Sequence, residues 1–450
     1  MEIIQSILGF FIAIGILVTF HEFGHFYIAR LFNVKVLNFS IGFGKTLYKK
    51  KFNNEGTEYS VGLIPLGGYV KMLESSELDP DLDKDKHPYC FDKQSVYKRF
   101  LIVAAGPVFN LILAIIFFTI VHFSGITGMK PFVTSIDGHN LPQIEGKSFH
   151  EIVEVNGVMT QRWQDVRVEI LNIIVNKNKL NLLVKDYKNE TSLLQINYDK
   201  NILQRDGDIV VNLGLHPRKP EFPSTIGTIE NNSPASLSGL KIGDRVFSVN
   251  NQAIDSWNGL VEKIQNNANN ILKLKIDRSG EILDIILVPA TNKNSSNQSG
   301  YAGISPDQTE LNNFRILVKY PFFESFYKST LLTYDYSILT FKMIFELFTG
   351  QANMKNISGP LSIAEFSGKS LSMGFVYFAY LLAILSISLG VLNLLPIPLL
   401  DGGHLVYYML EMLTGNPVSE KFQLVAQQVG MLILFSIMIV AFYNDFARLL

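Results

Sequence analysis

The sequence predicts a polytopic α-helical membrane protein with a membrane-associated β-hairpin and soluble α+β domains. Mean hydropathy is positive, and 48% of the 450 residues are hydrophobic. A transmembrane helix needs about 20 apolar residues at a rise of 1.5 Å per residue. Charge-free stretches that meet this requirement, or nearly meet it with help from their flanks, occur at residues 3–20, 100–129, 371–400 and 422–444. We therefore expect four transmembrane helices, with a long polar region between the second and the third.

Charge patterning predicts the orientation of the chain. The loop between the first two spans is rich in lysine, whereas no Lys or Arg precedes Ile3. By the positive-inside rule that loop is cytoplasmic, so residues 130–365 and both termini face outward. The first span has no basic n-region and no small-residue cleavage site, which indicates a retained anchor.

Composition also limits the partners. The net charge is −1 and no domain is strongly basic, so the sequence predicts no nucleic-acid partner. The one cysteine, Cys90, lies in the predicted cytoplasmic loop, and the external domains are expected to fold without disulfides.

The end of the first span carries a motif typical of zinc hydrolases, because residues 21–25 read His-Glu-Phe-Gly-His. On a helix, positions i and i+4 share a face, so His21 and His25 can offer two imidazole nitrogens to one Zn²⁺. Glu22 can then reach a water on the metal and act as the catalytic base. An ionisable cluster facing lipid would cost several kcal/mol, so its location favours a functional role.

A zinc site with two histidines usually needs a third protein ligand. Near the end of the third span, two prolines interrupt the helix and are followed by Asp401. We favour Asp401 as the third ligand. The alternatives are Glu55, Glu58 and His404.

Two further segments are predicted to lie beside this site. Small residues at 104–106 allow close packing of the second span on the first, and Asn110 is interpreted as a packing residue. Residues 36–73 predict a glycine-punctuated apolar β-hairpin with a basic turn at 49–51. It is either an ordinary cytoplasmic hairpin or a strand edge that pairs with an extended substrate. In the second case its substrate-binding residues are Gly42, Phe43 and Gly44.

The external region contains an internal repeat. Residues 155–157 and Trp163 recur as residues 249–251 and Trp257, a shift of 94 in both pairs (249 − 155 and 257 − 163). Two copies of one small domain are predicted, at residues 130–217 and 222–306.

The second copy resembles PDZ domains in its Ser-Pro-Ala segment at 233–235 and its Gly-Asp-Arg-Val turn at 243–246. PDZ domains accept a chain end along a sheet edge, with a Gly-containing loop donating N–H groups to the carboxylate. This resemblance points to Gly214 and Gly303 as the residues at that loop. The alternative is that both domains supply only steric bulk.

The remaining chain completes the expected organisation. Residues 314–350 have apolar residues at helical spacing and predict an amphipathic helix at the outer interface. This helix lies between the repeats and a C-terminal membrane region at residues 358–450. Residues 1–129 form the N-terminal membrane region, which includes the hairpin.

Together these motifs resemble the site-2 protease family across essentially the whole chain: the zinc motif, the Gly-Phe-Gly loop, two PDZ-like domains, and Asn-x-x-Pro-x-Pro-x-x-Asp-Gly at 393–402. The resemblance implies a multi-pass zinc protease of the bacterial inner membrane, with the PDZ-like domains in the periplasm and lipid around the spans. Its substrate would be a single-pass protein, such as an anti-sigma factor trimmed by another protease in envelope-stress signalling. Clearance of signal-peptide remnants would be a second role.

The resemblance assigns His21, His25 and Asp401 as metal ligands, Glu22 as the catalytic base and Asn393 as a substrate contact. Two rival functions are a membrane-tethered scaffold with an inactive metal site and a zinc transporter. A transporter should carry further His or Asp residues within its spans to form a relay, and here only His122 is added. A scaffold has no need for Glu22.

Overall fold

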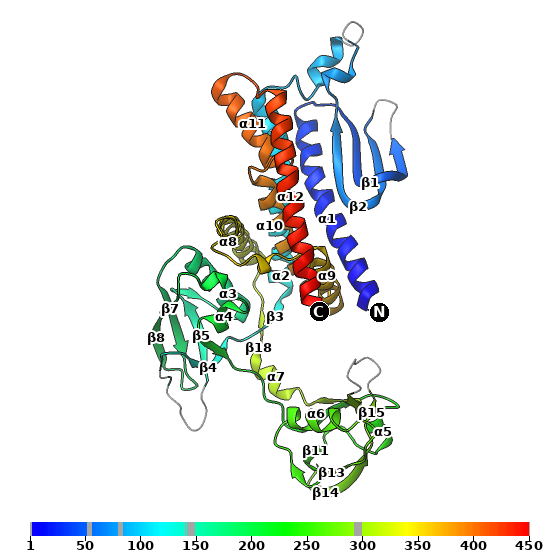
Figure 1. The fold of residues 1–450 in the computed structure, drawn as a ribbon, viewed down its shortest axis with the longest axis vertical. Helices are drawn as coiled ribbons and strands as arrows, with labels where there is room; N and C mark the ends of the chain where they lie inside the picture. Colours follow the sequence, from blue (N-terminus) through cyan, green and yellow to red (C-terminus); the bar gives the residue numbers. More distant parts are fainter. Residues whose placement is uncertain are drawn as a thin grey trace.

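Four long apolar helices form the membrane part of the computed structural model, which describes residues 2–51, 56–79, 84–139, 141, 149–291 and 299–449 (Figure 1). They are α1 (Glu2–Leu31), α2 (Val96–Ser124), α10 (Phe375–Leu394) and α12 (Glu420–Leu449). Within the described residues, only these helices are long and apolar enough to cross a membrane. The prediction of four spans is confirmed.

Hydropathy misplaced the ends of two spans. α2 ends at Ser124, and the last residues of the predicted span form strand β3 (Ile126–Met129), which pairs with β18 (Arg315–Val318). The predicted span 371–400 is interrupted at Gly374, whose φ of +111° ends α9 (Pro360–Met373), and α10 stops at Leu394 before the two prolines. A short helix that the sequence did not predict, α11 (Asp401–Thr414), follows these prolines.

The spans pack closely around α2. A Cβ on Gly24 would lie 2.5 Å from the carbonyl oxygen of Ala105, so the backbones of α1 and α2 touch there. Phe118 of α2 is fully buried in an apolar cluster with side chains from α1 and α10. Small residues at helix contacts are the usual means of close association in membranes.

The predicted hairpin is a curved sheet made of β1 (Val36–Lys51) and β2 (Glu58–Met72). Residues 36–41 of β1 lie between two segments of β2, residues 68–72 on one side and residues 58–61 on the other. Residues 46–51 of β1 pair with residues 58–62 of β2. The prediction of a basic turn at 49–51 is wrong, because these lysines belong to β1. The sheet lies beside α1 (Figure 1), and 68–72 is one of its edges.

Two units follow α2 in the chain. In the first, the sheet order is β8-β7-β5-β4-β9, with β6 paired to β5. Its elements are β4 (Phe132–Ile136), β5 (His150–Val155), β6 (Val158–Met159), α3 (Trp163–Val175), β7 (Leu180–Lys185), β8 (Thr191–Ile196), α4 (Ile209–Asn212) and β9 (Leu215–Pro217).

The second unit has a four-stranded sheet, β12-β11-β13-β14, and two strand pairs, β10-β17 and β15-β16. Its elements are β10 (Ile226–Ile229), α5 (Pro234–Leu237), β11 (Arg245–Val249), β12 (Gln252–Ala253), α6 (Trp257–Gln265), β13 (Leu272–Arg278), β14 (Glu281–Leu287), β15 (Ala290–Thr291), β16 (Gly300–Tyr301) and β17 (Ile304–Pro306).

The two units share local geometry at the repeated residues. Asn156 and Asn250 both have positive φ, and the side-chain oxygen of each accepts a hydrogen bond from the next long strand, at Asn181 and Lys273 respectively. The two tryptophans begin α3 and α6. Gly214 and Gly303 have the same φ of +74°, and each carbonyl accepts a backbone hydrogen bond from the unit's first strand region.

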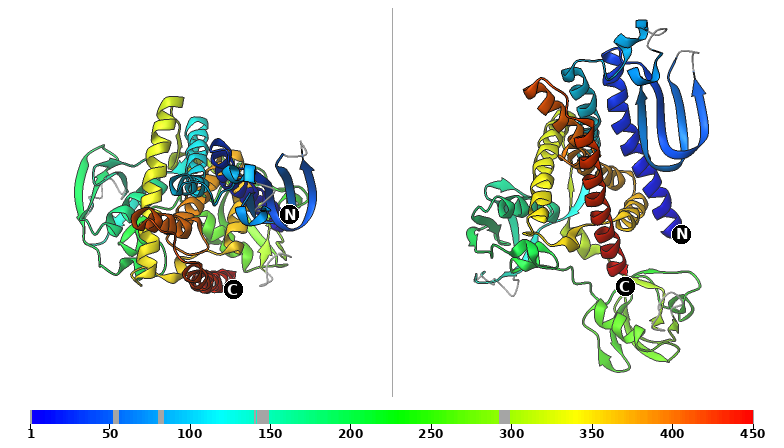
Figure 2. Two further views of the ribbon diagram at one scale, coloured as in Figure 1. Left: turned by 90° about the horizontal axis from the view of Figure 1, so that it is seen from above. Right: turned by 45° about the horizontal axis from the view of Figure 1, so that its top comes forward.

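The first unit is joined to the membrane part by an apolar contact. Its core continues into Leu339 of α8 (Phe322–Phe348) and into Ala352 just beyond that helix. Asp206 adds an ion pair with Lys355 at 2.6 Å. α8 runs across the direction of the spans, as the view from above shows (Figure 2).

α8 corresponds to the helix predicted at 314–350, but it is shorter than expected. It begins at Phe322, since residues 315–318 form β18 and α7 (Thr309–Phe314) precedes that strand. α8 keeps aromatic side chains exposed along its length, including Phe323, Tyr334 and Phe345.

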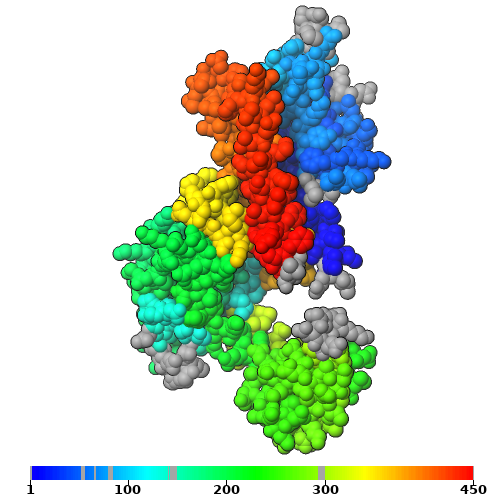
Figure 3. Space-filling model, viewed as in Figure 1, coloured from blue at the N-terminus to red at the C-terminus, as the bar shows by residue number. Residues whose placement is uncertain are grey.

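The second unit stands apart from the spans (Figure 3). The polypeptide enters and leaves this unit at neighbouring residues, since the amide of Asp307 donates a hydrogen bond to the carbonyl of Thr225 at 2.9 Å. No apolar cluster among the described residues joins its core to the membrane part. The two units are thus attached in different ways.

Candidate metal centre

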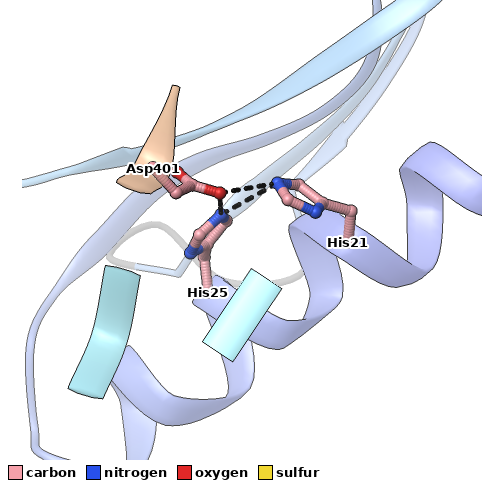
Figure 4. Close-up of side chains that lie close together, drawn as sticks. All are labelled: His21, His25 and Asp401. Carbon is pink, nitrogen blue, oxygen red and sulfur yellow. Dashed lines mark hydrogen bonds and ion pairs between the residues drawn. The ribbon is translucent and has the colours of Figure 1, made fainter. Parts of the chain in front are cut away.

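Three side chains from two distant parts of the chain meet at one point (Figure 4). His21 and His25 lie on α1 with their Nε2 atoms 3.3 Å apart. The Oδ2 atom of Asp401 lies 3.0 Å from His21 Nε2 and 3.5 Å from His25 Nε2. Among the described residues, this is the only group of three or more His, Cys, Asp or Glu side chains spaced to hold a metal ion.

The spacing of these three atoms fits a zinc ion. Two donors at about 2.0–2.1 Å from a tetrahedral zinc lie about 3.3 Å apart, close to all three separations. The Oδ2 atom of Asp401 is buried and has no hydrogen-bond partner among the described residues. A buried carboxylate oxygen facing two imidazole nitrogens is costly without a cation between them.

α2 packs directly against both imidazoles. His25 Nδ1 lies 2.9 Å from the carbonyl oxygen of Ile102. A Cβ on Gly106 would lie 2.3 Å from His25 Nε2 and 2.9 Å from His21 Cε1, so any larger residue would displace the rings. The small residues predicted to pack α2 on α1 thus also make room for the cluster.

The helix break after α10 determines the position of Asp401. The prolines end α10, and the loop from 395 to 400 turns the chain with Leu399 at a φ of +95°. Asp401 then opens α11, and a Cβ on Gly402 would lie 2.0 Å from the carbonyl oxygen of Leu395. An ion pair of 2.6 Å between Arg99 and Glu411 fastens α11 to the start of α2.

The alternatives to Asp401 lie elsewhere. Glu58 is on β2, where it contacts Asn38 and Lys49. His404 follows Asp401 by three residues in α11 and packs on Tyr407 without joining the cluster. Glu55 lies outside the described residues.

Glu22 follows His21 on α1 and lies beside the edge of the sheet. Its side chain is half-buried and makes no hydrogen bond with any described residue. A Cβ on Gly68 would lie 2.9 Å from Glu22 Cγ, so the edge at 68–72 passes directly beside this carboxylate.

The Gly-Phe-Gly residues form a bend further along the sheet. Gly42 and Gly44 have φ of +90° and +82°, and the ring of Phe43 stacks on that of Tyr69, with centroids 6.4 Å apart. Asn393 lies in the last turn of α10, half-exposed, and its amide makes no hydrogen bond with a described residue. None of these four belongs to the three-residue cluster.

Sequence reasoning missed the contact made by Asn110. Its side-chain amide nitrogen lies 3.1 Å from His21 Nδ1, and the residue is fully buried. The signal was present in the sequence as an amide within an apolar span, one turn after Gly106.

Comparisons with known proteins point to a protease family. The model of peptidase family M50 matches residues 9–437. The chain is 37% identical over 455 residues to a "Putative zinc metalloprotease" of Vibrio cholerae. It is 36% identical over 457 residues to "Protease RseP" of Yersinia pestis and 34% identical over 452 residues to "Regulator of sigma-E protease RseP" of Escherichia coli. All three matches cover the whole of both chains.

The family match and the named relatives favour a protease over the scaffold and transporter alternatives. The family is zinc-dependent, which agrees with the expected cofactor. The chain belongs to peptidase family M50, the site-2 protease family, and is a zinc metalloprotease.

Proposed function

We propose that this protease cleaves the transmembrane segment of single-pass membrane proteins, with His21, His25 and Asp401 holding zinc. The observation that carries the proposal is the position of the cluster: two ligands lie on α1, an apolar helix long enough to span a bilayer, and the third opens α11. A zinc site at this place can act on a peptide bond within the membrane.

Zinc held by His21, His25 and Asp401 would supply a Lewis acid for the scissile carbonyl and for a water molecule. Glu22 accepts the proton of that water and then gives it to the leaving amine. Its carboxylate is available for this task because no described residue hydrogen-bonds it. The carbonyl of Ile102 holds the imidazole of His25 in place.

The sheet edge and Asn393 are proposed to present the substrate. A scissile amide must leave its helical hydrogen bonds before it can react, and an open strand edge offers replacement bonds. The edge at 68–72 is suited to this because it passes beside Glu22. The bend of Gly42, Phe43 and Gly44 would set the curvature of the sheet that carries this edge, and the free amide of Asn393 would bond the substrate backbone.

The proposed substrate is an anti-sigma factor or a similar single-pass protein that another protease has already trimmed. Support comes from the relative in E. coli named as a regulator of sigma-E protease. The proposed location is the bacterial inner membrane, with the two external units in the periplasm. Signal-peptide remnants are a second candidate substrate class, since they too are short apolar helices.

The test is reconstitution of the purified chain in lipid with a single-pass peptide. We expect zinc-dependent cleavage at a bond within the apolar segment of the peptide, located by mass spectrometry of the products. Cuts confined to the flanking soluble residues would contradict the intramembrane proposal.

The orientation leads to a labelling prediction. In a Cys90→Ser background, Glu281→Cys should react with an impermeant thiol reagent added to intact cells stripped of their outer membrane, and Lys50→Cys should react only after lysis. Both positions are exposed, so access to the reagent is set by the membrane. The reverse pattern would contradict the orientation.

We propose that the external units resemble PDZ domains in fold and restrict entry of untrimmed substrates by size. The second unit can be removed cleanly, since Thr225 and Asp307 are hydrogen-bonded neighbours. Removing the first unit would instead uncover the apolar contact with α8. Replacing residues 226–306 by Gly-Gly should therefore keep cleavage of trimmed substrate and permit cleavage of untrimmed substrate.

A different result is expected if the second unit captures the new C-terminal carboxylate of a trimmed substrate. The excision should then slow cleavage of trimmed substrate, and amidation of that terminus should slow it in the intact chain. Gly303 is a poor site for this test, because a Cβ there would lie 2.3 Å from Ser233 Cβ and disturb the fold. Gly214 is equally constrained by Asp137.

A further inference from the structure

The buried amide of Asn110 lies behind His21, on the side of the ring opposite the zinc cluster. Its Nδ2 atom is 3.1 Å from His21 Nδ1, whereas His21 Nε2 faces Asp401. Asn110 is 0% exposed, so bulk water does not reach this contact.

A histidine that binds zinc through Nε2 must keep its lone pair on that atom and carry its proton on Nδ1. The Nδ1–H group then needs an acceptor. For His25 the acceptor is the carbonyl of Ile102 at 2.9 Å. For His21, the group at this position is the amide of Asn110.

Rotation of that amide by 180° places its oxygen toward His21 Nδ1. The rotation breaks no existing hydrogen bond at the other end, because the Oδ1 atom of Asn110 has no partner among the described residues. With zinc on Nε2, the proton of His21 would lie on Nδ1, where only the rotated amide could accept it.

We propose that Asn110 is a positioning residue that accepts the Nδ1–H of His21 and so fixes the tautomer and ring orientation required for zinc binding. The inference rests on the proposed role of His21 as a ligand. Groups behind metal ligands commonly have this effect, and their loss typically lowers metal affinity about 10- to 100-fold.

The surrounding helices hold Asn110 in place. Ser386 of α10 donates to the backbone carbonyl of Asn110 at 2.7 Å. A Cβ on Gly390 would lie 3.0 Å from Pro107 O and 3.4 Å from Asn110 Cβ, so α10 packs directly on this turn of α2. The carboxamide therefore reaches His21 from a rigid position.

The experiment measures the zinc dissociation constant of the purified full chain by competition with a chromogenic chelator. Asn110→Leu removes the acceptor at similar volume and should raise the constant about 10- to 100-fold. Asn110→Asp keeps an acceptor oxygen and should remain within about threefold of wild type. Asn110→Ala replaces the Leu variant if the latter does not fold.

A matched control separates this role from general stability. Asn444 is also buried in a span, where its amide donates to the carbonyls of Met354 and Ile357, far from the cluster in the sequence. Asn444→Leu should lower the thermal unfolding temperature without changing the zinc constant. The visible spectrum of bound Co²⁺ should change in Asn110→Leu and remain unchanged in Asn444→Leu.

His21→Ala distinguishes the inference from the function on which it rests. Loss of zinc in His21→Ala with an unchanged constant in Asn110→Leu would overturn only the role of Asn110. Equal weakening in Asn110→Asp and Asn110→Leu would also overturn it. Stoichiometric zinc in His21→Ala would overturn the proposed ligand set itself.

Discussion

Glu22→Gln should lower the rate of peptide cleavage about 10³-fold or more while leaving zinc bound at the wild-type level. General acid–base catalysis contributes about 10²- to 10⁴-fold, and one carboxylate is proposed to serve both proton transfers. Gln has the same shape but cannot accept the proton. Cleavage of a reconstituted single-pass peptide and metal content by atomic emission measure the two quantities separately.

Asp substitution at the same position provides a matched control for Glu22→Gln. Glu22→Asp keeps the carboxylate but withdraws it by one methylene, so partial activity should remain. If Glu22→Gln cleaves at more than about a tenth of the wild-type rate, Glu22 is not the proton acceptor. Loss of zinc in Glu22→Gln would instead indicate that this carboxylate supports the metal.

Asp401→Ala should weaken zinc binding by more than about 100-fold and abolish cleavage. The expected effect exceeds the 10- to 100-fold loss typical of groups that only support a ligand, because Asp401 would itself contact the metal. Removing it leaves the two imidazoles of α1 as the remaining protein donors of the cluster. Equilibrium dialysis against buffered zinc measures the affinity.

His404→Ala is the matched control, since His404 lies on the same helix and was an alternative ligand. Its ring packs on Tyr407 outside the cluster, so zinc affinity should stay within about threefold of wild type, below the loss expected of a supporting group. Stoichiometric zinc in Asp401→Ala together with loss of zinc in His404→Ala would transfer the ligand role to His404.

The local features of this protein follow from its amino-acid sequence alone. Apolar length predicts the four spans because crossing a bilayer is a property of the segment itself. The i, i+4 spacing places His21 and His25 on one face of a helix whatever that helix packs against. The recurring Asn and Trp residues of the two units likewise follow from the chain, since repeats are visible in sequence.

Packing between distant segments sets where the elements end and what they meet. Mean hydropathy sums the transfer free energies of side chains and does not depend on the direction of the backbone. The span predicted from hydropathy therefore ran past the end of α2 into β3, and α11 was not predicted. The meeting of Asp401 with the histidines depends on the proline loop and on the Arg99–Glu411 ion pair. The contact of Asn110 with His21 and the unequal attachment of the two units arise only in the folded chain, because local patterns do not encode which distant segments touch.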